Sequence, residues 1–316
     1  MKEKKRAKRL SWSHPADWLY VLCWTAAAAT VALLAWIVLE IFSQALPSLR
    51  KFGLQFFIRA SWNPNTDHFG ALPFLVGTTM SSAFALLIAL PLGIAIAIFL
   101  SEDFLPSVFR QSIRFVVELL AAIPSVVYGL WGAAIVIPIV RKGGNWLSNS
   151  LGFIPLFQGP VFGNSMLAAS LILALMVLPT ITAISRNALV EVPKTLREGA
   201  YALGATRWEA IFGVILPTAS PGIVAATILA LGRAMGETMA VAMLIGNSTR
   251  LTFSLLAPAG TLASLLANQF AEAEGLQVSS LMHAALLLML LTLLVNATGE
   301  IILRRTQRIT VKIRQR

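Results

Sequence analysis

Two opposite charges interrupt an apolar stretch of this chain. Residues 222–246 are apolar or small except near their middle, where Arg233 and Glu237 stand four positions apart. A charge at the centre of a membrane helix costs roughly 2.5–3.5 kcal/mol on insertion scales, so it needs a partner or a polar function. In a continuous helix the two side chains share one face and can form an ion pair.

The chemistry that this pair suggests is the passage of an anion. An arginine guanidinium offers planar, paired N–H donors that match an oxyanion such as phosphate. Glu237 would hold the geometry of Arg233 and keep the anion from binding too tightly to be released. A structural salt bridge that locks helix packing is the alternative, and the residues alone leave both interpretations open.

Other residues complete the candidate pathway. Gly232 and Gly236 lie on the next face of the same expected helix, and their spacing favours close approach of a neighbouring helix. Ser125 and Tyr128 follow Pro124 in another apolar stretch, and they are candidates for lining a gate. We therefore expect an interior helix whose charged face meets a central path.

The composition indicates a membrane protein. Hydrophobic residues make up 57% and charged residues 12% of the chain, whereas soluble domains contain about 25% charged residues. Runs of about 17–25 mainly apolar residues can span a bilayer as helices, and prolines inside them are tolerated as kinks. We expect an all-α protein with six spans, at residues 18–41, 72–100, 112–140, 165–186, 217–246 and 279–303.

The positive charges indicate how the spans are oriented. Eighteen of the 25 Lys and Arg residues lie in the two tails and in the second-to-third and fourth-to-fifth connections, and six lie in the other three connections. The positive-inside rule then places both termini in the cytoplasm. The net charge of +11 thus reports topology, and nucleic-acid binding is not expected. Because span 18–41 is longer than the apolar core of a signal peptide, we expect an uncleaved first helix.

The chain is expected to form one membrane domain in contact with lipid, residues 18–303, between basic cytoplasmic tails at 1–17 and 304–316. Three long connections, 42–71, 141–164 and 247–278, lie on the outer side. Their Gly, Pro and Asn residues predict turns, as in Trp62-Asn63-Pro64-Asn65 and Gly143-Gly144-Asn145.

Motifs for catalysis or metal binding are missing from the sequence. It contains no P-loop for a nucleotide and no H-E-x-x-H zinc motif. The three histidines are far apart and Cys23 is the single cysteine, so no metal site and no intrachain disulfide are expected. We expect neither catalysis nor a cofactor in this chain.

The fourth-to-fifth connection, residues 192–217, predicts two short helices. Pro193 marks the start of the first, and Thr206 with Glu209 has the spacing of a capping box for the second. Gly204 supplies a break between them. The first helix either fills a groove on a partner protein or forms a simple surface elbow, and the face in question carries Leu196, Ala200 and Leu203.

The same connection resembles a cytoplasmic motif of ABC-importer permeases, the binding-protein-dependent inner-membrane components, which reads E-A-A-x-x-x-G-x9-I-x-L-P. Gly199 replaces the second position's Ala and Val214 replaces Ile, and the spacing is kept. The resemblance implies the type I ABC importer permease fold and a loop that docks into a cleft of an ATPase subunit. The implied ATPase-coupling residues are Glu198, Gly199, Ala200, Gly204, Leu216 and Pro217.

Four segments are similar to the phosphate-specific branch of these permeases, and together they extend over most of the chain: 61–78, 118–132, 197–211 and 232–247. The similarity implies a permease subunit of an ATP-driven phosphate importer in the bacterial inner membrane, with Arg233 and Glu237 in the translocation pathway. The implied partners are a homologous permease subunit, two ATPase subunits that bind ATP and Mg²⁺, and an extracytoplasmic phosphate-binding protein.

Other functions stay open on the residues alone. Sulfate and molybdate are tetrahedral oxyanions too, so a permease for one of them is an alternative. A secondary transporter with Glu237 as a proton relay would need no ATPase, but the docking motif and the lack of a visible inverted repeat argue against it. A non-transporting scaffold would leave the central charges unexplained.

Overall fold

Helices make up most of the part of the chain that the structure describes. The computed structural model covers residues 15–102, 104 and 106–314. Within these ranges the only β-structure is one isolated bridge, between Asn63 and His68. The expected all-α class is confirmed. Residues 1–14, which include the lysines and arginines of the expected N-terminal tail, lie outside the described residues.

Six helices in these ranges are long and apolar enough to cross a membrane, as expected. The first and last run further than predicted, because α1 reaches Phe52 and α13 reaches Arg314. The six are built from α1 (Pro15–Phe52), α3 (Leu72–Ser101), α5 to α6 (Ser125–Leu151), α7 (Met166–Val190), α9 to α10 (Arg207–Gly236) and α13 (Leu276–Arg314).

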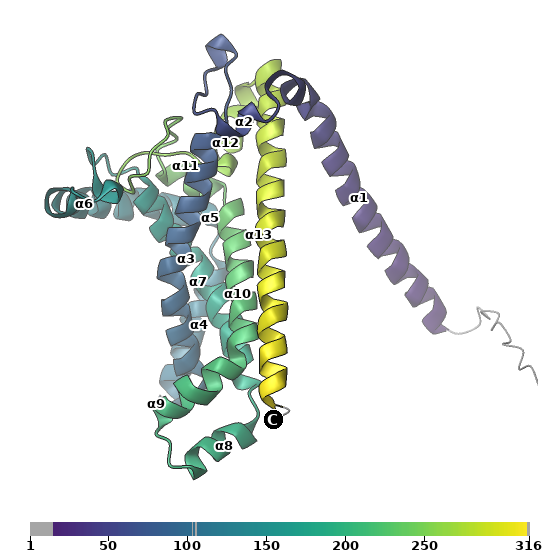
Figure 1. Cartoon of the computed structure of the whole chain (residues 1–316), viewed down its shortest axis with the longest axis vertical. Helices are drawn as coiled ribbons and strands as arrows, with labels where there is room; N and C mark the ends of the chain where they lie inside the picture. Colours follow the sequence, from purple (N-terminus) through teal and green to yellow (C-terminus); the bar gives the residue numbers. More distant parts are fainter. Residues whose placement is uncertain (1–14, 103, 105, 315–316) are drawn as a thin grey trace, which may run out of the picture.

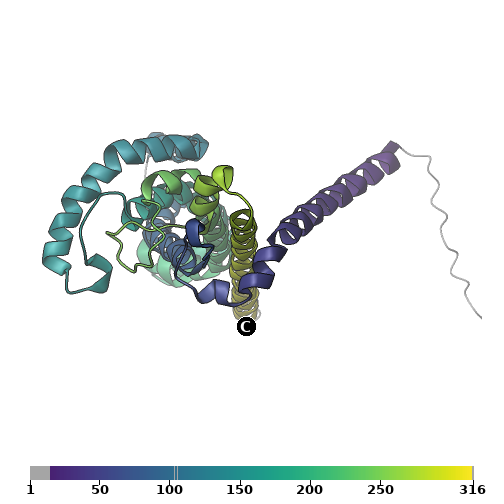
Figure 2. The same ribbon diagram turned by 90° about the horizontal axis from the view of Figure 1, so that it is seen from above.

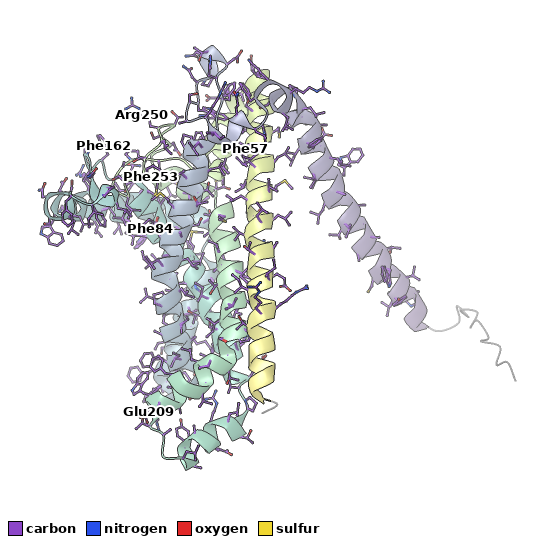
Figure 3. The ribbon with its side chains drawn as sticks, in the orientation of Figure 1. Phe57, Phe84, Phe162, Glu209, Arg250 and Phe253 are labelled. Atoms are coloured by element: carbon purple, nitrogen blue, oxygen red, sulfur yellow. The ribbon has the colours of Figure 1, made fainter. Side chains whose placement is uncertain are left out.

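Short helices gather at the two ends of the bundle (Figure 1). One end carries α8 (Lys194–Ala202), α9 (Arg207–Ala210) and the end of α13, and the other carries α2 (Gln55–Ile58), α11 (Met239–Leu244) and α12 (Leu262–Gln269). Figure 3 shows the same division, with Glu209 at the first end and Arg250 and Phe162 at the second. The expected cytoplasmic connection 192–217 and the expected outer connections therefore lie at opposite ends.

Helices α3 and α7 form a tightly packed pair within the helix bundle. A Cβ on Gly93 of α3 would lie 2.7 Å from Cγ2 of Ile181 in α7, so the two backbones approach closely. Small residues permit such an approach between membrane helices, where packing rather than hydrophobic burial drives association. On α3 they recur at every fourth position, all buried: Ser81, Ala85, Ala89, Gly93 and Ala97.

The third expected span, residues 112–140, is wrong as a single helix. Helix α4 (Ser107–Ala122) ends where Ile123 and Pro124 become extended, with ψ of 128° and 145°. The pyrrolidine ring disfavours the helical region for the residue before a proline, which accounts for the break. The chain then restarts as α5 (Ser125–Trp131), continues through the π-helical turn η2 (Gly132–Val136) and becomes α6 (Ile137–Leu151).

The prolines inside the expected spans have different effects. Pro91 and Pro179 lie within continuous helices, α3 and α7. Pro138 instead follows η2, and Pro217 follows a second π-helical turn, η4 (Ile211–Ile215). A proline lacks an N–H and its ring clashes with the carbonyl one turn earlier, so a widened turn accommodates it.

Helix α6 leaves the bundle sideways, as Figures 1 and 2 show. The turn predicted at Gly143-Gly144-Asn145 is wrong, because all three residues lie inside this helix. A Cβ on Gly144 would lie 2.8 Å from Cγ1 of Val161 and 3.1 Å from Cδ2 of Leu256. This glycine therefore serves close packing of the helix against two loops rather than a turn.

The other predicted turn, at residues 62–65, is confirmed. The Asn63 side chain accepts a hydrogen bond from the backbone N–H of Asn65 and caps η1 (Pro64–Thr66), and Asp67 adopts a φ of 50°. Trp62 anchors the turn, because its ring packs at 4.9 Å from Phe69 and 5.5 Å from Phe74 between ring centroids. An aromatic cluster thus holds the base of this exposed loop.

Helix α1 leans away from the rest of the molecule (Figures 1 and 2). Its last turns pack against α13 and bury Ala45, Ser48 and Phe52. The preceding turns are exposed, with Trp24 and Trp36 among their uncovered side chains. Within this chain, α1 is therefore an apolar arm that no other described element covers along most of its length.

Candidate functional site

The fifth expected span, residues 217–246, is wrong as one helix. Helix α10 (Leu216–Gly236) ends at Gly236, and Glu237 is extended with ψ of 127°. The chain then forms α11, which packs on α5 so closely that a Cβ on Gly129 would lie 3.3 Å from Cα of Ala240. Glycine is among the weakest helix formers, so a helix gives way at Gly236 when tertiary contacts pull the next segment aside.

The break separates the two central charges. Arg233 and Glu237, both described by the structure, form no ion pair with each other, so the expected i,i+4 pair is wrong. Instead Nη1 of Arg233 donates a hydrogen bond to Oγ1 of Thr180 in α7, at 3.3 Å. Oε1 of Glu237 accepts one from the backbone N–H of Ala240 in α11, at 3.4 Å. Glu237 has left the helix that carries Arg233, and its carboxylate serves the start of the next one.

Arg233 remains available to a ligand. Its side chain is exposed, and the bond to Thr180 uses one of the five N–H donors of a guanidinium. Glu237 is half-buried. A guanidinium held on one side by a hydroxyl and open on another can bind an oxyanion through its remaining donors.

Tyr128 of α5 lies within electrostatic range of the Arg233 charge. The ring is buried, and its hydroxyl donates to the carbonyl of Leu120 in α4, at 2.9 Å. This bond bridges the break at Pro124. Ser125 is half-buried at the first position of α5. The structure thus brings Tyr128 toward Arg233, and the gate role of Ser125 and Tyr128 stays a prediction.

Sequence reasoning missed Thr180. It lies in the apolar helix α7, directly after Pro179, and threonines are common in such helices. Its sequence position lies 53 residues from Arg233, so no local spacing indicates that the two side chains meet. Only the packing of α7 against α10 reveals the contact.

The glycine face predicted for α10 is only partly correct. A Cβ on Gly232 would lie 3.4 Å from Oδ1 of Asn296 in α13, an ordinary van der Waals distance, and Gly236 has open space around it. Helices α10 and α13 approach more closely at Gly299 of α13, where an added Cβ would lie 2.5 Å from Cγ1 of Ile228 in α10. Helix α13 is therefore the neighbour that the glycine face of α10 predicted, but the closer contact between the two helices is made at Gly299 of α13.

The connection at 192–217 has the predicted form. Helix α8 follows Pro193, Gly204 adopts a φ of +84°, and α9 follows it. The capping box is complete: Glu209 Oε2 accepts from the backbone N–H of Thr206 at 2.7 Å, and Thr206 Oγ1 accepts from the N–H of Glu209 at 3.4 Å. Two short helices and a left-handed turn form a projection at this end of the bundle (Figure 1).

The expected apolar face of α8 is wrong in one respect. Ala200 is buried, whereas Leu203 is 91% exposed, so they do not share one surface. Glu198 and Gly199 are exposed, and a Cβ on Gly199 would meet nothing within 4 Å. Glu198, Gly199 and Leu203 are therefore exposed where Ala200 is not, while Leu216 and Pro217 start α10, and a docking role for these residues stays a prediction.

Comparison with known proteins identifies the family. The family model described as "Binding-protein-dependent transport system inner membrane component" matches residues 89–308, which include the α8–α9 projection and Arg233. The chain belongs to this family. It is thus a transport permease subunit of the ABC importer class and a multi-pass protein of the inner membrane.

Relatives of this permease carry a more specific name. "Phosphate transport system permease protein PstC" of Mesorhizobium japonicum is 43% identical over 286 residues, covering 89% of this chain and 87% of that protein. The "Probable phosphate transport system permease protein PstC" of Methanocaldococcus jannaschii is 38% identical over 272 residues, covering 84% and 86%.

Solved structures show that the permease has the fold of this class. A bacterial ABC transporter involved in the import of the acidic polysaccharide alginate matches with a TM-score of 0.55 at 18% identity, covering 92% of this chain and 99% of that one. The inward-facing MetNI methionine ABC transporter matches with a TM-score of 0.53 at 23% identity, covering 75% and 94%.

Proposed function

We propose that this chain is the membrane-spanning permease subunit of an ATP-driven importer of inorganic phosphate. The observation that carries the proposal is the 43% identity, over most of both chains, to a relative named as a phosphate transport permease. The exposed guanidinium of Arg233 supports it, because planar paired donors suit a tetrahedral oxyanion.

The phosphate path in this proposal passes Arg233. Thr180 positions the guanidinium, Tyr128 lies within range of its charge, and Glu237 adds a negative charge nearby in the chain. A nearby carboxylate weakens anion binding, which favours release over retention. In this scheme Arg233 is the contact residue for phosphate, and the other three set its geometry and field.

ATP hydrolysis takes place outside this chain. The complex holds two ATPase subunits that bind ATP and Mg²⁺, and the projection made by α8 and α9 docks into a cleft of an ATPase subunit, with Glu198 and Gly199 on the contact surface. ATP binding closes the ATPases and displaces this projection, and the spans rotate to open the path to the other side. The permease contributes no hydrolytic residue and holds no cofactor.

Further partners complete the transporter. A homologous permease subunit forms the second half of the path, and the uncovered apolar arm α1 offers surface for it and for lipid. An extracytoplasmic phosphate-binding protein delivers the anion at the end that carries α2, α11 and α12. The α8–α9 end of the bundle faces the cytoplasm, and the two basic tails are assigned to the same side from the distribution of Lys and Arg.

The test is uptake of radiolabelled phosphate at low concentration by cells that lack only this chain. Uptake is expected to depend on the restored wild-type chain and on ATP, and excess sulfate is expected not to compete. Competition by sulfate or molybdate would assign another oxyanion. Uptake that follows a proton gradient and continues without ATP would contradict the proposal.

A further inference from the structure

Arg197 of α8 joins three helices. Its Nη1 forms an ion pair with Oε1 of Glu102, the residue that ends α3. Its Nη2 donates a hydrogen bond of 2.6 Å to the carbonyl of Leu189, in the last turn of α7. One side chain therefore links α8 to the ends of both helices of the central pair. We call this arrangement the Arg197 anchor.

The anchor is better shielded from water than the two ion pairs that form within single helices, Arg114–Glu118 in α4 and Arg304–Glu300 in α13. The side chains of Arg197 and Glu102 are 18% and 12% exposed, whereas those of Arg114 and Glu118 are 59% and 61% exposed. Exposed pairs are screened and contribute little, while a partly buried pair interacts more strongly and is costly to break on one side. The guanidinium also uses two nitrogens toward two acceptors, a geometry that lysine cannot reproduce.

A second contact ties the same end of α3 to the projection. Phe104, two residues after Glu102, stacks on Trp208 of α9 with ring centroids 5.1 Å apart. Phe104 also lies 5.7 Å from Phe99 within the last turns of α3. The end of α3 is thus bound by α8 through the anchor and by α9 through the stacked rings.

The central pair leads from this contact to the proposed phosphate site. Helices α3 and α7 pack closely along the small residues of α3, and α7 carries Thr180, which binds Arg233. A displacement of α8 that the anchor passes to α3 and α7 therefore reaches the helix that positions Arg233. Apart from the anchor, α8 is connected to this pair by the chain at residues 191–193, and its main other packing is against α9 and η4.

We propose that Arg197 is a positioning residue that makes α3 and α7 move together with the ATPase-docking projection. The inference rests on the proposed function where its test measures phosphate transport. It assigns to Arg197 the transmission of movement between α8 and the α3–α7 pair, with Glu102 as its partner.

The first experiment measures coupling in the complete transporter, reconstituted in liposomes with its partner permease, ATPases and binding protein. For Arg197→Gln and Glu102→Gln we expect ATP hydrolysis to persist, while the amount of phosphate transported per ATP hydrolysed falls about fivefold or more. Typical coupling free energies between two sites correspond to changes of this size. The ratio of phosphate to ATP in Arg197→Lys is expected to lie between those of the wild type and Arg197→Gln. The double variant Arg197→Glu with Glu102→Arg, which reverses the two charges, is expected to recover part of the lost ratio. Arg114→Gln, which breaks an exposed pair within α4, is the matched control and should not change the ratio.

An unchanged ratio of phosphate to ATP in Arg197→Gln would overturn the inference. So would a parallel loss of hydrolysis, uptake and copurified ATPase, because that pattern describes a residue needed only for folding or assembly. The partial recovery by the reversed pair distinguishes a specific contact from a general loss of stability.

A second experiment does not depend on the substrate. Spin labels are placed at Lys194 in α8 and Leu92 in α3, both exposed, after Cys23→Ser. With the anchor intact, the distance between the two labels is expected to be the same with and without trapped ATP. In Arg197→Gln, this distance is expected to differ between the two states. An equal change of the label distance with Arg197 present and in Arg197→Gln would refute the role of the anchor. Absence of phosphate uptake by the wild-type complex would instead refute only the proposed substrate.

Discussion

Arg233 of α10 and Thr180 of α7 are joined by a hydrogen bond of 3.3 Å between Nη1 and Oγ1. The bond connects the helix that carries the central positive charge to the helix that packs along α3. Glu237, which the spacing predicted as the partner of Arg233, binds the backbone of Ala240 instead. The environment of the cation is therefore set by helix packing and not by its nearest carboxylate in sequence.

Removal of the Arg233 charge is expected to reduce phosphate uptake strongly. Charge-assisted hydrogen bonds contribute about 1.5–3 kcal/mol each, so Arg233→Ala should reduce uptake by at least about tenfold. Arg233→Lys keeps the charge but loses the paired donors and should retain part of the activity. Uptake by cells with equal amounts of each variant in the membrane measures the effect. Normal uptake by Arg233→Ala would remove this residue from the path.

Loss of the Thr180 hydroxyl is expected to have a smaller effect. Thr180→Val preserves shape and removes one hydrogen bond, which contributes about 0.5–1.5 kcal/mol, so uptake should fall about two- to tenfold. Thr180→Ser keeps the hydroxyl and is the matched control. The comparison is made on initial uptake rates. If the valine and serine variants behave alike, the hydroxyl does not position Arg233.

Reversal of the two central charges is not expected to restore transport. In a salt bridge, the double variant Arg233→Glu with Glu237→Arg would recover what each single change loses. Here the two side chains have different partners, so the double variant should be as inactive as Arg233→Glu alone. Glu237→Gln keeps an oxygen that can accept from Ala240 and should retain more activity than Glu237→Ala. Rescue by the double variant would contradict the observed geometry.

Substitution of Glu198 is expected to affect the ATPase contact and leave insertion intact. Removing an important side chain from an interface costs about 2 kcal/mol or more, so Glu198→Ala should weaken copurification of the ATPase by about tenfold or more. The control is Glu191→Ala, an exposed carboxylate at the end of α7. The readout is the ratio of ATPase to permease after purification from membranes. Unchanged assembly together with unchanged transport would show that the projection is a simple elbow.

The close packing of α3 on α7 predicts a stability effect. Gly93→Val must displace Ile181, because even a Cβ would lie 2.7 Å from its methyl group, and overpacking costs about 1–3 kcal/mol. The matched control is Gly143→Ala in α6, where a Cβ meets nothing within 4 Å and the change should be neutral or slightly stabilising. Thermal unfolding of the purified protein in detergent compares the two. Equal midpoints would show that α3 and α7 separate more easily than their geometry indicates.

The sequence by itself determined the features that depend on local composition and spacing. Apolar length predicts six helices able to span a membrane, because a bilayer sets a minimum run of apolar residues. The capping box of Thr206 and Glu209 predicts the start of α9, because its hydrogen bonds join residues three positions apart. The motif at Glu198 to Pro217 predicts the family that the match over residues 89–308 shows, since such a motif depends on residue identity at fixed spacing.

Only the tertiary structure decided where the spans break and what the central charges contact. Gly144 is a turn former by type, yet it lies inside a helix because Val161 and Leu256 require its small size. Gly236 lies in an apolar run that reads as one helix, yet the chain breaks there because the next segment packs on α5. Arg233 meets Thr180, and Arg197 meets Glu102, across 53 and 95 residues. Helical periodicity reports only neighbours within a few turns, so contacts between distant helices follow from packing alone.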